Sequence, residues 1–569
     1  LFYDDSGIVD DYVLYKLAAL RRHVDPIFVV SNSPLTHDGR HRLEQVADTV
    51  WVRENTGFDV WAYKEALDVL GDERLAEFDE LVFMNYTFFG PIYPFEETFE
   101  RMDTEELDFW GLTEHKGERG SYNGAERTLS PHLQSHWIAV RKRLFQSIEF
   151  QKYWSTMPII TSYDESIMQH ESRFTEYFSS RGFRYQVAFP ADNYPSDHPL
   201  FENITLLLAD RCPIIKRRIF FHEPTYLDHK AIIARRAMEL IEKTDYPVDL
   251  IWRNVVRSVE PRTLYTNLSM LSVLPDGKHA EVTEPAPRIC VIAHVYYVDM
   301  IDEMMSYISR IPVPYDLVVT TDSRAKQDVI GCAIDKYEVG NVDVRVLESN
   351  RGRETSAFLI GCRDVLESRK YDLICKVHSK KSAHNTYNSG VLFKQHMFDN
   401  LLSSPAYVSM MLKMFGREPT LGMVFPPVVN IGFPTLGHAW FTNRPAAVKL
   451  ADELGIRTQF DRSTPVAPYG GMFWCRPEAV APIVRHPWTW DDFPDRAQWV
   501  DGGLAHVIER LYAYAAMQGG YHVRCAMNAD WAEINYTFLE YKLQRISSML
   551  PAYTQEQANY LKRVTTEGP

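Results

Sequence analysis

The sequence predicts two tandem α/β domains with mostly parallel sheets, and three observations support this prediction. The chain has 569 residues, more than one domain ordinarily holds. Short β-branched runs alternate with helical patterns, which is typical of parallel strands covered by helices. The same series of strand, glycine and helix signals also occurs twice in the same order, so a duplicated unit would explain the length.

Each half opens with a β-branched run that ends in small polar residues, residues 27–33 in the first half and 317–323 in the second. These runs predict buried strands. A further short strand follows, and then the pattern N-x-G-x-[DE] at residues 55–59 and 350–354. A helical pattern begins at this point in both halves, so the same strand, turn and helix are expected twice.

The correspondence extends toward the end of each half. Strands are expected at residues 80–85 and 372–378, and each terminates in polar residues. Further along the chain, residues 135–141 align with residues 470–476. Ordered matches of this kind favour a duplication, although any two α/β domains share some strand, glycine and helix signals.

A segment rich in proline and glycine separates the two halves. The predicted domains are residues 1–258, with a helical extension at the end, and residues 288–540. Residues 259–287 are expected to be the linker, and residues 541–569 a C-terminal helix and tail.

The composition argues against nucleic acid as the main partner. The chain has 61 Lys and Arg against 76 Asp and Glu, a net charge of −15, so its average surface repels phosphate backbones. Seven cysteines are scattered singly, which is typical of a reducing compartment. No apolar run has the length of a membrane span. Because residue 1 falls within a predicted strand, we expect the sequence to be an excised region of a longer polypeptide.

The repeated turn motif suits a nucleotide-sugar site. Gly57 and Gly352 allow the backbone to approach a ligand, and Asp59 or Glu354, two residues on, can accept hydrogen bonds from sugar hydroxyls. A structural helix cap is the alternative for either carboxylate. Tyr63 is expected to stack on a base or to lie in the core. The motif asparagines, Asn55 and Asn350, belong to the same predicted sites.

A basic cluster lies at the end of the strand at residues 372–378. Lys376, Lys380 and Lys381 are positioned to neutralise a diphosphate leaving group, with His378 as a donor or a metal ligand. The alternative is a solvated loop, which is common for a Lys-Lys pair.

Two helices carry candidate general bases. Glu171 lies on an apolar helical stripe, and Glu509 is its counterpart in the second half. His506 and Arg510 are beside Glu509, and Asp501 comes just before the helix. A buried structural ion pair is the alternative for either glutamate.

No D-x-D motif occurs in the sequence, so the usual carboxylate pair for Mg²⁺ or Mn²⁺ on a diphosphate is missing and no metal ligand is assigned. A G-x-S-x-G elbow, a P-loop and an H-E-x-x-H motif are also lacking. The commonest hydrolase, kinase and zinc-protease classes are thereby disfavoured.

At these motifs the sequence resembles the rhamnan synthesis protein F family, bacterial glycosyltransferases of rhamnose-containing polysaccharides. The resemblance extends from about residue 2 to about residue 540 and rests on Phe28-Val-Val-Ser-Asn32, Asn55-x-Gly-x-Asp59, Met84-Asn85-x-x-x-x-Gly90-Pro91, Gln134-Ser135, His294-Val-Tyr-Tyr297, Lys376-Val-His-Ser-Lys-Lys381 and Gly471-Met-Phe-Trp-Cys-Arg-Pro477.

The resemblance implies GT-A-like, Rossmann-type domains that transfer rhamnose from a dTDP-linked donor onto a lipid-linked glycan. This places the protein in the cytoplasm, peripheral to the inner face of the plasma membrane. Substrate contacts are also expected from Asn32, Asn85, Thr87, Gln134, Ser135, His294, Tyr297, Asp322, Trp474 and Arg476.

One departure from the family pattern affects the first half. The family's strand-end Asn-Asp-Ser is here Asn85-Tyr86-Thr87, without the acidic group, which weakens the case for metal-dependent catalysis in that domain. The sequence therefore predicts a glycosyltransferase. The alternative is a non-catalytic glycan-binding or scaffold protein, which would bind glycan but not nucleotide.

Overall fold

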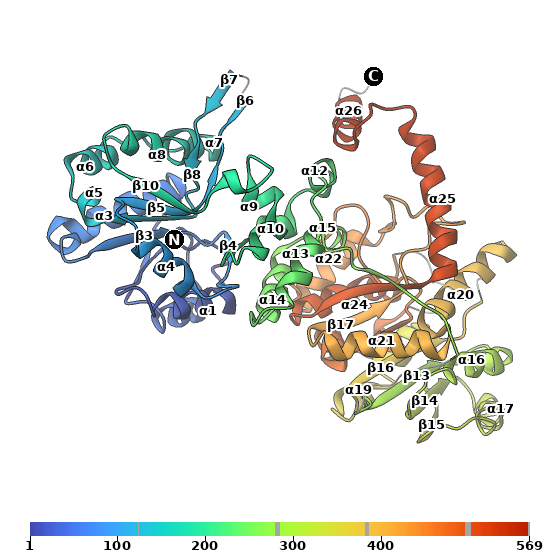
Figure 1. Cartoon of the computed structure of the whole chain (residues 1–569). Coiled ribbons are helices and arrows are strands. Elements are labelled where there is room, and N and C mark those ends of the chain that lie inside the picture. The colour runs from blue at the N-terminus through green and yellow to red at the C-terminus, as the bar shows by residue number, and fades with distance from the viewer. Residues whose placement is uncertain (123–124, 279–284, 382–385, 495–501, 567–569) are drawn as a thin grey trace. The chain divides into compact units, whose positions relative to one another are not determined.

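The computed structural model describes residues 1–122, 125–278, 285–381, 386–494 and 502–566. The chain divides into two compact units: Leu1–His222 with Lys230–Ile251, and Glu223–His229 with Trp252–Pro569. Both combine helices with sheets, as expected of an α/β protein (Figure 1). Most strand pairs of the second unit are parallel, as predicted. Most strand pairs of the first unit are antiparallel, so the prediction of mostly parallel sheets is wrong there.

The strands of the first unit are β1 (Phe28–Ser31), β2 (Thr49–Val52), β3 (Glu80–Met84), β4 (Phe88–Phe89), β5 (Phe109–His115), β6 (Glu118–Tyr122), β7 (Ala125–Leu129), β8 (His132–Leu133), β9 (Trp137–Arg141), β10 (Tyr185–Phe189) and β11 (Ile215–Lys216). Its helices are α1 (Asp11–Leu20), α2 (His37–Glu44), α3 (Phe58–Leu75), α4 (Phe95–Asp103), α5 (Lys142–Phe145), α6 (Ile148–Ser155), α7 (Tyr163–Ser166), α8 (Ser172–Ser179), α9 (Pro199–Glu202), α10 (Ile204–Ala209), α11 (Arg218–Phe221) and α13 (Ala234–Ile241). Helix α14 (Asp249–Ser258) crosses the division between the units.

The strands of the second unit are β12 (Leu271–Leu274), β13 (Ile289–His294), β14 (Tyr315–Thr321), β15 (Val342–Val346), β16 (Leu373–His378), β17 (Leu421–Phe425), β18 (Phe473–Cys475) and β19 (His522–Asn528). Its helices are α12 (Pro224–His229), α15 (Pro261–Asn267), α16 (Ile301–Ile308), α17 (Arg324–Ile334), α18 (Arg353–Leu359), α19 (Arg363–Glu367), α20 (Tyr387–Leu402), α21 (Pro405–Arg417), α22 (Arg444–Glu453), α23 (Ala481–Val484), α24 (Leu504–Gln518), α25 (Ala529–Ser547) and α26 (Thr554–Thr566).

One strand order occurs in both units. The first unit has the order β10-β5-β9-β3, and the sheet of the second contains β19-β17-β18-β16. The directions agree as well: the first pair is parallel in each series, and the two following pairs are antiparallel. In the second unit β13, β14 and β15 continue the sheet beyond β16 as parallel strands.

The central strands of the second unit are β13 and β16, and every residue of both is buried. Helices cover a sheet of this kind on both faces, so its inner strands become continuous apolar runs. The hydrophobic core of the second unit includes Val291, Leu317 and Cys375 from these strands and β14. The first unit has a separate core, which includes Phe109, Phe174 and Phe178.

The division of the chain differs from the expected domain boundaries. It falls near residue 251, and residues 259–287 contribute α15 and β12, of which β12 pairs with β19. The segment that was expected to be a linker thus contains a helix and an edge strand of the second unit. Helix α25 likewise continues across residue 540. No helix within the described residues is both long and apolar enough to cross a membrane.

Candidate functional site

The N-x-G-x-[DE] motif forms the same turn in both units. Gly57 and Gly352 have φ angles of 76° and 75°, and the next residues, Phe58 and Arg353, both have φ of 54°. Helices α3 and α18 start directly after the two glycines. Two successive residues in the left-handed region are uncommon, and they direct the start of each helix to the carboxyl ends of the strands.

Three charged groups meet at one point in the second unit, beside Gly471. A Cβ atom on this glycine would lie 3.4 Å from Nζ of Lys376, 3.7 Å from Oε2 of Glu509 and 3.8 Å from Oε1 of Glu354. Lys376 also donates a hydrogen bond to the carbonyl oxygen of Gly471 at 2.5 Å. A lysine from β16 is therefore held between carboxylates from α18 and α24.

Burial and neighbouring charges both shift the pKa values in this cluster. It lowers the pKa of Lys376 to about 8, although Glu354 and Glu509 act in the opposite direction. Burial would raise the pKa of Glu354, but the charges of Arg353 and Lys376 outweigh it and hold the pKa well below its usual range. Glu354 is therefore ionised at neutral pH, and Lys376 is close to its titration point.

Further polar groups border the cluster at the end of β16. His378 is 4% exposed, and its Nδ1 has no hydrogen-bond partner among the described residues. Burial lowers the pKa of His378 well below 6.5, so the ring is neutral. Lys380 interacts electrostatically with Glu509 and Glu354, and burial lowers its pKa too. On β13, Nδ1 of His294 lies 3.0 Å from Oγ1 of Thr320.

The first unit has a polar network at the corresponding strand end, after β3. Asn85 donates from Nδ2 to Oδ2 of Asp59 at 2.9 Å, and its Oδ1 accepts from the hydroxyl of Thr87 at 2.6 Å. Ser135 donates to Oε2 of Glu171 from its hydroxyl and from its backbone nitrogen. Five of the residues predicted for a site in this half thus form two hydrogen-bonded groups, one of Asp59, Asn85 and Thr87 and one of Ser135 and Glu171.

Among the described residues, no three His, Cys, Asp or Glu side chains are arranged to hold a metal ion. The carboxylates of the second unit, Glu354 and Glu509, instead face Lys376.

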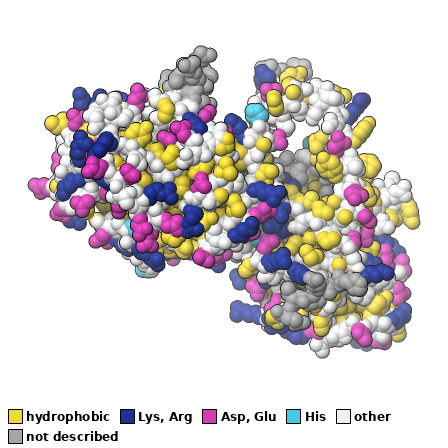
Figure 2. Space-filling view, in the orientation of Figure 1, with side chains coloured by type: hydrophobic (Ala, Val, Ile, Leu, Met, Phe, Trp, Pro, Cys, Tyr) yellow, Lys and Arg dark blue, Asp and Glu magenta, His cyan; other side chains and the backbone are white. Residues whose placement is uncertain are grey.

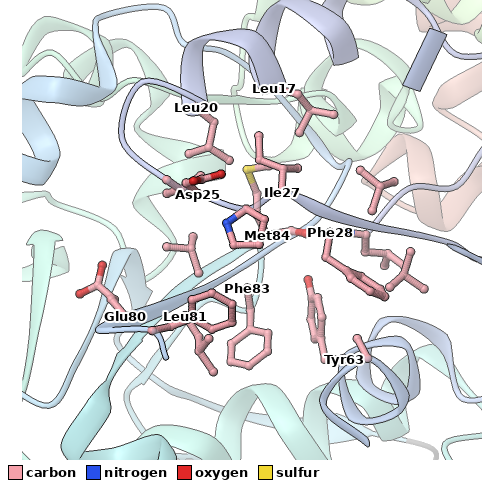
Figure 3. A pocket seen from close by; sticks show the side chains of 18 of the residues that line it. Leu17, Leu20, Asp25, Ile27, Phe28, Tyr63, Glu80, Leu81, Phe83 and Met84 are labelled. Atoms are coloured by element: carbon pink, nitrogen blue, oxygen red, sulfur yellow. Dashed lines mark hydrogen bonds between the residues drawn. The ribbon is translucent and has the colours of Figure 1, made fainter. Parts of the chain in front are cut away.

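A cavity of about 590 Å³ in the first unit adjoins this strand end, because Asn85 and Tyr86 are among its lining residues. It lies between β1 and β3, and its lining includes Phe28, Phe83 and Met84 (Figure 3). In the second unit β13 occupies the place between the corresponding strands, β14 and β16. The cavity thus lies where the second unit has a further strand of its sheet.

Comparison with protein families supports one assignment. The family described as "Rhamnan synthesis protein F" matches residues 27–521. The chain belongs to the rhamnan synthesis protein F family. This membership connects it with polysaccharide biosynthesis.

Curated relatives of this family member are themselves uncharacterised. It is 30% identical over 246 residues to the uncharacterised protein WxcX from two strains of Xanthomonas campestris pv. campestris, which covers 42% of this chain and 32% of WxcX. It is 23% identical over 184 residues to the uncharacterised protein y4gN of Sinorhizobium fredii, covering 32% of this chain and 45% of y4gN. The matches thus span less than half of either relative.

Several residues predicted for the rhamnan synthesis protein F site lie away from the charged cluster. Trp474 is fully buried and donates from Nε1 to the carbonyl oxygen of Leu401 at 3.2 Å. Arg476 donates to the carbonyl oxygens of Leu421 and Phe415. Both side chains donate to backbone carbonyl oxygens, so this motif contributes Trp474 and Arg476 to the packing of the second unit.

Other predicted residues pair with neighbours near the strand ends. Tyr63 is buried in the first unit, against Phe83. Lys381 pairs with Asp299, and Asp322 with Lys326.

The remaining predicted residues have the following contacts: Asn32 donates to Asn55, Gln134 contacts Thr113 and His198, Tyr297 donates its backbone N–H to Ser379, and His506 contacts Arg353. Asn350 accepts a backbone hydrogen bond from Arg353. Asp501 lies outside the described residues.

Sequence reasoning missed two contributors to these strand ends, Gly471 and Lys216. Gly471 lies inside a motif of the sequence, but its role depends on the two glutamates that converge there. Arg510, which was expected beside Glu509, forms an ion pair with it and lies over the ring of Tyr469. In the first unit, Lys216 reaches Thr87 from β11, and the basic run at residues 216–218 was the available signal.

Proposed function

We propose that this protein is a glycosyltransferase that moves a deoxyhexose, rhamnose in the first instance, from a nucleoside-diphosphate donor onto a growing lipid-linked cell-surface polysaccharide. The observation that carries the proposal is the convergence of Lys376, Glu354 and Glu509 beside Gly471. Glycosyl transfer from a nucleoside-diphosphate donor needs a positive charge for the leaving diphosphate and a base for the acceptor hydroxyl, and this cluster offers both.

The proposed fold is a tandem pair of GT-A-like domains. The shared strand order and the two left-handed turns support this reading, because a duplicated unit would produce both. In open α/β sheets ligands bind at the carboxyl ends of the strands. The charged cluster lies there in the second unit.

In the proposed reaction, the donor diphosphate lies against Lys376 and Lys380. The acceptor hydroxyl oxygen attacks the anomeric carbon of the sugar while the bond from that carbon to the phosphate oxygen breaks. The proton of the hydroxyl passes to Glu509, and the nucleoside diphosphate leaves with the electron pair of the broken bond. Glu354, ionised throughout, orients the sugar or ribose hydroxyls and keeps Lys376 charged.

The decisive test separates binding from transfer. Binding is measured by calorimetric titration of the purified protein with dTDP-rhamnose and UDP-glucose. Sugar transfer is measured with polysaccharide isolated from the producing cells as the acceptor, and the nucleoside diphosphate that is released is the readout. Glu509→Gln is expected to keep donor binding and to lower transfer by about 10²- to 10⁴-fold, the usual contribution of a general base. Glu478→Gln, on a short helical turn after β18, is the matched control and should leave both unchanged.

A non-catalytic glycan-binding protein would give the opposite result. It would bind the isolated polysaccharide, ignore every nucleotide sugar and tolerate Glu509→Gln. That outcome would overturn the proposed function.

A further inference from the structure

A lysine also lies at the strand end of the first unit, although it comes from a different part of the chain. Lys216 is in β11, which pairs antiparallel with β4 immediately after Thr87. Its Nζ donates to Oγ1 of Thr87 at 2.8 Å, and the backbone nitrogen of Arg217 donates to the carbonyl oxygen of Thr87 at 3.0 Å. The short sheet therefore fixes Lys216 beside the polar residues that follow β3.

Two carboxylates interact with this lysine. Glu171 and Asp59 both act electrostatically on Lys216. Asp59 is held by Asn85, which also binds the Thr87 hydroxyl, so a continuous hydrogen-bond chain joins Asp59 to Lys216. Glu171 accepts a hydrogen bond from the backbone nitrogen of Ser135 at 3.2 Å.

The second unit has the same arrangement with other residues. Asp59 and Glu354 occupy the same place after their left-handed glycines. Glu171 and Glu509 belong to the corresponding helical segments, beside Ser135 and Gly471 respectively. In each unit a lysine is thus flanked by one carboxylate from the turn motif and one from the later helix.

The lysines themselves are not equivalent in sequence. Lys376 pairs with Phe473 across β16 and β18, and the corresponding pair in β3 and β9 is Phe83 with Ile138. Phe83 therefore stands where the second unit has Lys376. The first unit has no lysine at this strand position, and its strand end has Lys216 from β11. Both units thus place a lysine between two carboxylates, although the lysines come from different strands. This is expected if the function of each unit requires a lysine there.

We propose that the first unit contains a second nucleoside-diphosphate-sugar site, with Lys216 on the diphosphate, Asp59 on the sugar or ribose hydroxyls and Glu171 as the base. This inference rests on the function proposed for the second unit and extends it to two donor sites in one chain. The bond changes are those described above: the anomeric carbon loses the phosphate oxygen and gains the acceptor oxygen, and Glu171 takes the proton.

The test counts sites. Calorimetric titrations of the full chain with dTDP, UDP and GDP are expected to give two sites per chain in total. Lys216→Met should weaken one site by on the order of 10- to 100-fold and leave the other, whereas Lys376→Met should do the reverse. Lys216→Arg should retain both sites, because it keeps the charge.

Two further variants and a stability measurement separate an effect on binding from an effect on folding. Lys152→Met removes an exposed lysine of α6 in the same unit and should leave both sites intact. Thr87→Val removes the hydroxyl that accepts from Lys216, and it should weaken the first-unit site alone. The melting temperature of each variant shows whether the fold is retained.

The outcomes distinguish the two proposals. If one nucleotide binds per chain and only Lys376→Met abolishes it, the second site is refuted and the proposed function stands. If Lys216→Met retains both sites, Lys216 is no part of a diphosphate site. Should the wild-type chain bind no nucleotide of the panel, both proposals fail.

Discussion

The buried lysines are the residues on which the chemistry depends. Burial lowers the pKa of Lys376 and that of Lys216 to about 8, while two carboxylates around each oppose the shift. An amine in this range changes charge close to physiological pH, unlike an exposed lysine with a pKa near 10.4. Affinity for a diphosphate should therefore depend on pH.

This dependence can be measured for one site at a time. In a Lys216→Met background, dTDP binding to the second unit should be strongest below pH 8, where Lys376 is protonated. It should weaken as pH rises through 8, approaching a tenfold loss per pH unit because one proton is linked to binding. Calorimetry between pH 7 and 9.5 provides the measurement.

Arginine stays protonated over this range, so the same background with Lys376→Arg should show a nearly flat profile. An equally steep decline in the arginine variant would assign the titration to another group.

At the scale of the element, the turn before each helix fixes the position of a carboxylate. Gly352 precedes α18 with φ of 75°, and a Cβ atom there would lie 2.4 Å from the ring of Phe493. Gly57 precedes α3 with φ of 76°, and a Cβ atom would lie 2.3 Å from the ring of Trp61. Both the backbone conformation and the packing thus require glycine.

Gly352→Ala should accordingly lower the free energy of unfolding by roughly 1–3 kcal/mol, since it combines left-handed strain with a steric clash. Gly416→Ala is the matched control: Gly416 lies in α21 with open space around it and should gain up to about 1 kcal/mol. Urea unfolding monitored by circular dichroism compares the two. A Gly352→Ala protein as stable as the wild type would show that the turn is not rigidly required.

At the scale of the whole molecule, each unit has its own core and its own polar strand end. Figure 2 shows Lys and Arg side chains interspersed with Asp and Glu over the face in view. The chain has a net charge of −15, and the lysines at the strand ends do not conflict with this acidic balance. Two carboxylates of the same unit interact with each of these lysines.

The cysteines provide a check on both cores together. All seven are free thiols, and Cys332 is exposed whereas the other six are buried. A thiol reagent such as Ellman's reagent should modify one cysteine per native chain and all seven in guanidinium chloride, because burial blocks access. Cys332→Ser should reduce the native value to zero. Rapid reaction of several thiols in the native protein would contradict the packing of both cores.

The sequence by itself determined the α/β class, the repeated N-x-G-x-[DE] turn and the polar ends of β3 and β16. These features are local, since a β-branched run or a left-handed glycine leaves its signal within a few residues. Only the tertiary structure decided which side chains meet. Lys216 is 129 residues from the Thr87 that it contacts, and Gly471 is 95 residues from Lys376. Trp474 is a residue for which the motif predicted a substrate contact. In the structure its side chain is buried in the core of the second unit. Contacts of this range arise from sheet pairing and helix packing, which a pattern along one chain does not record.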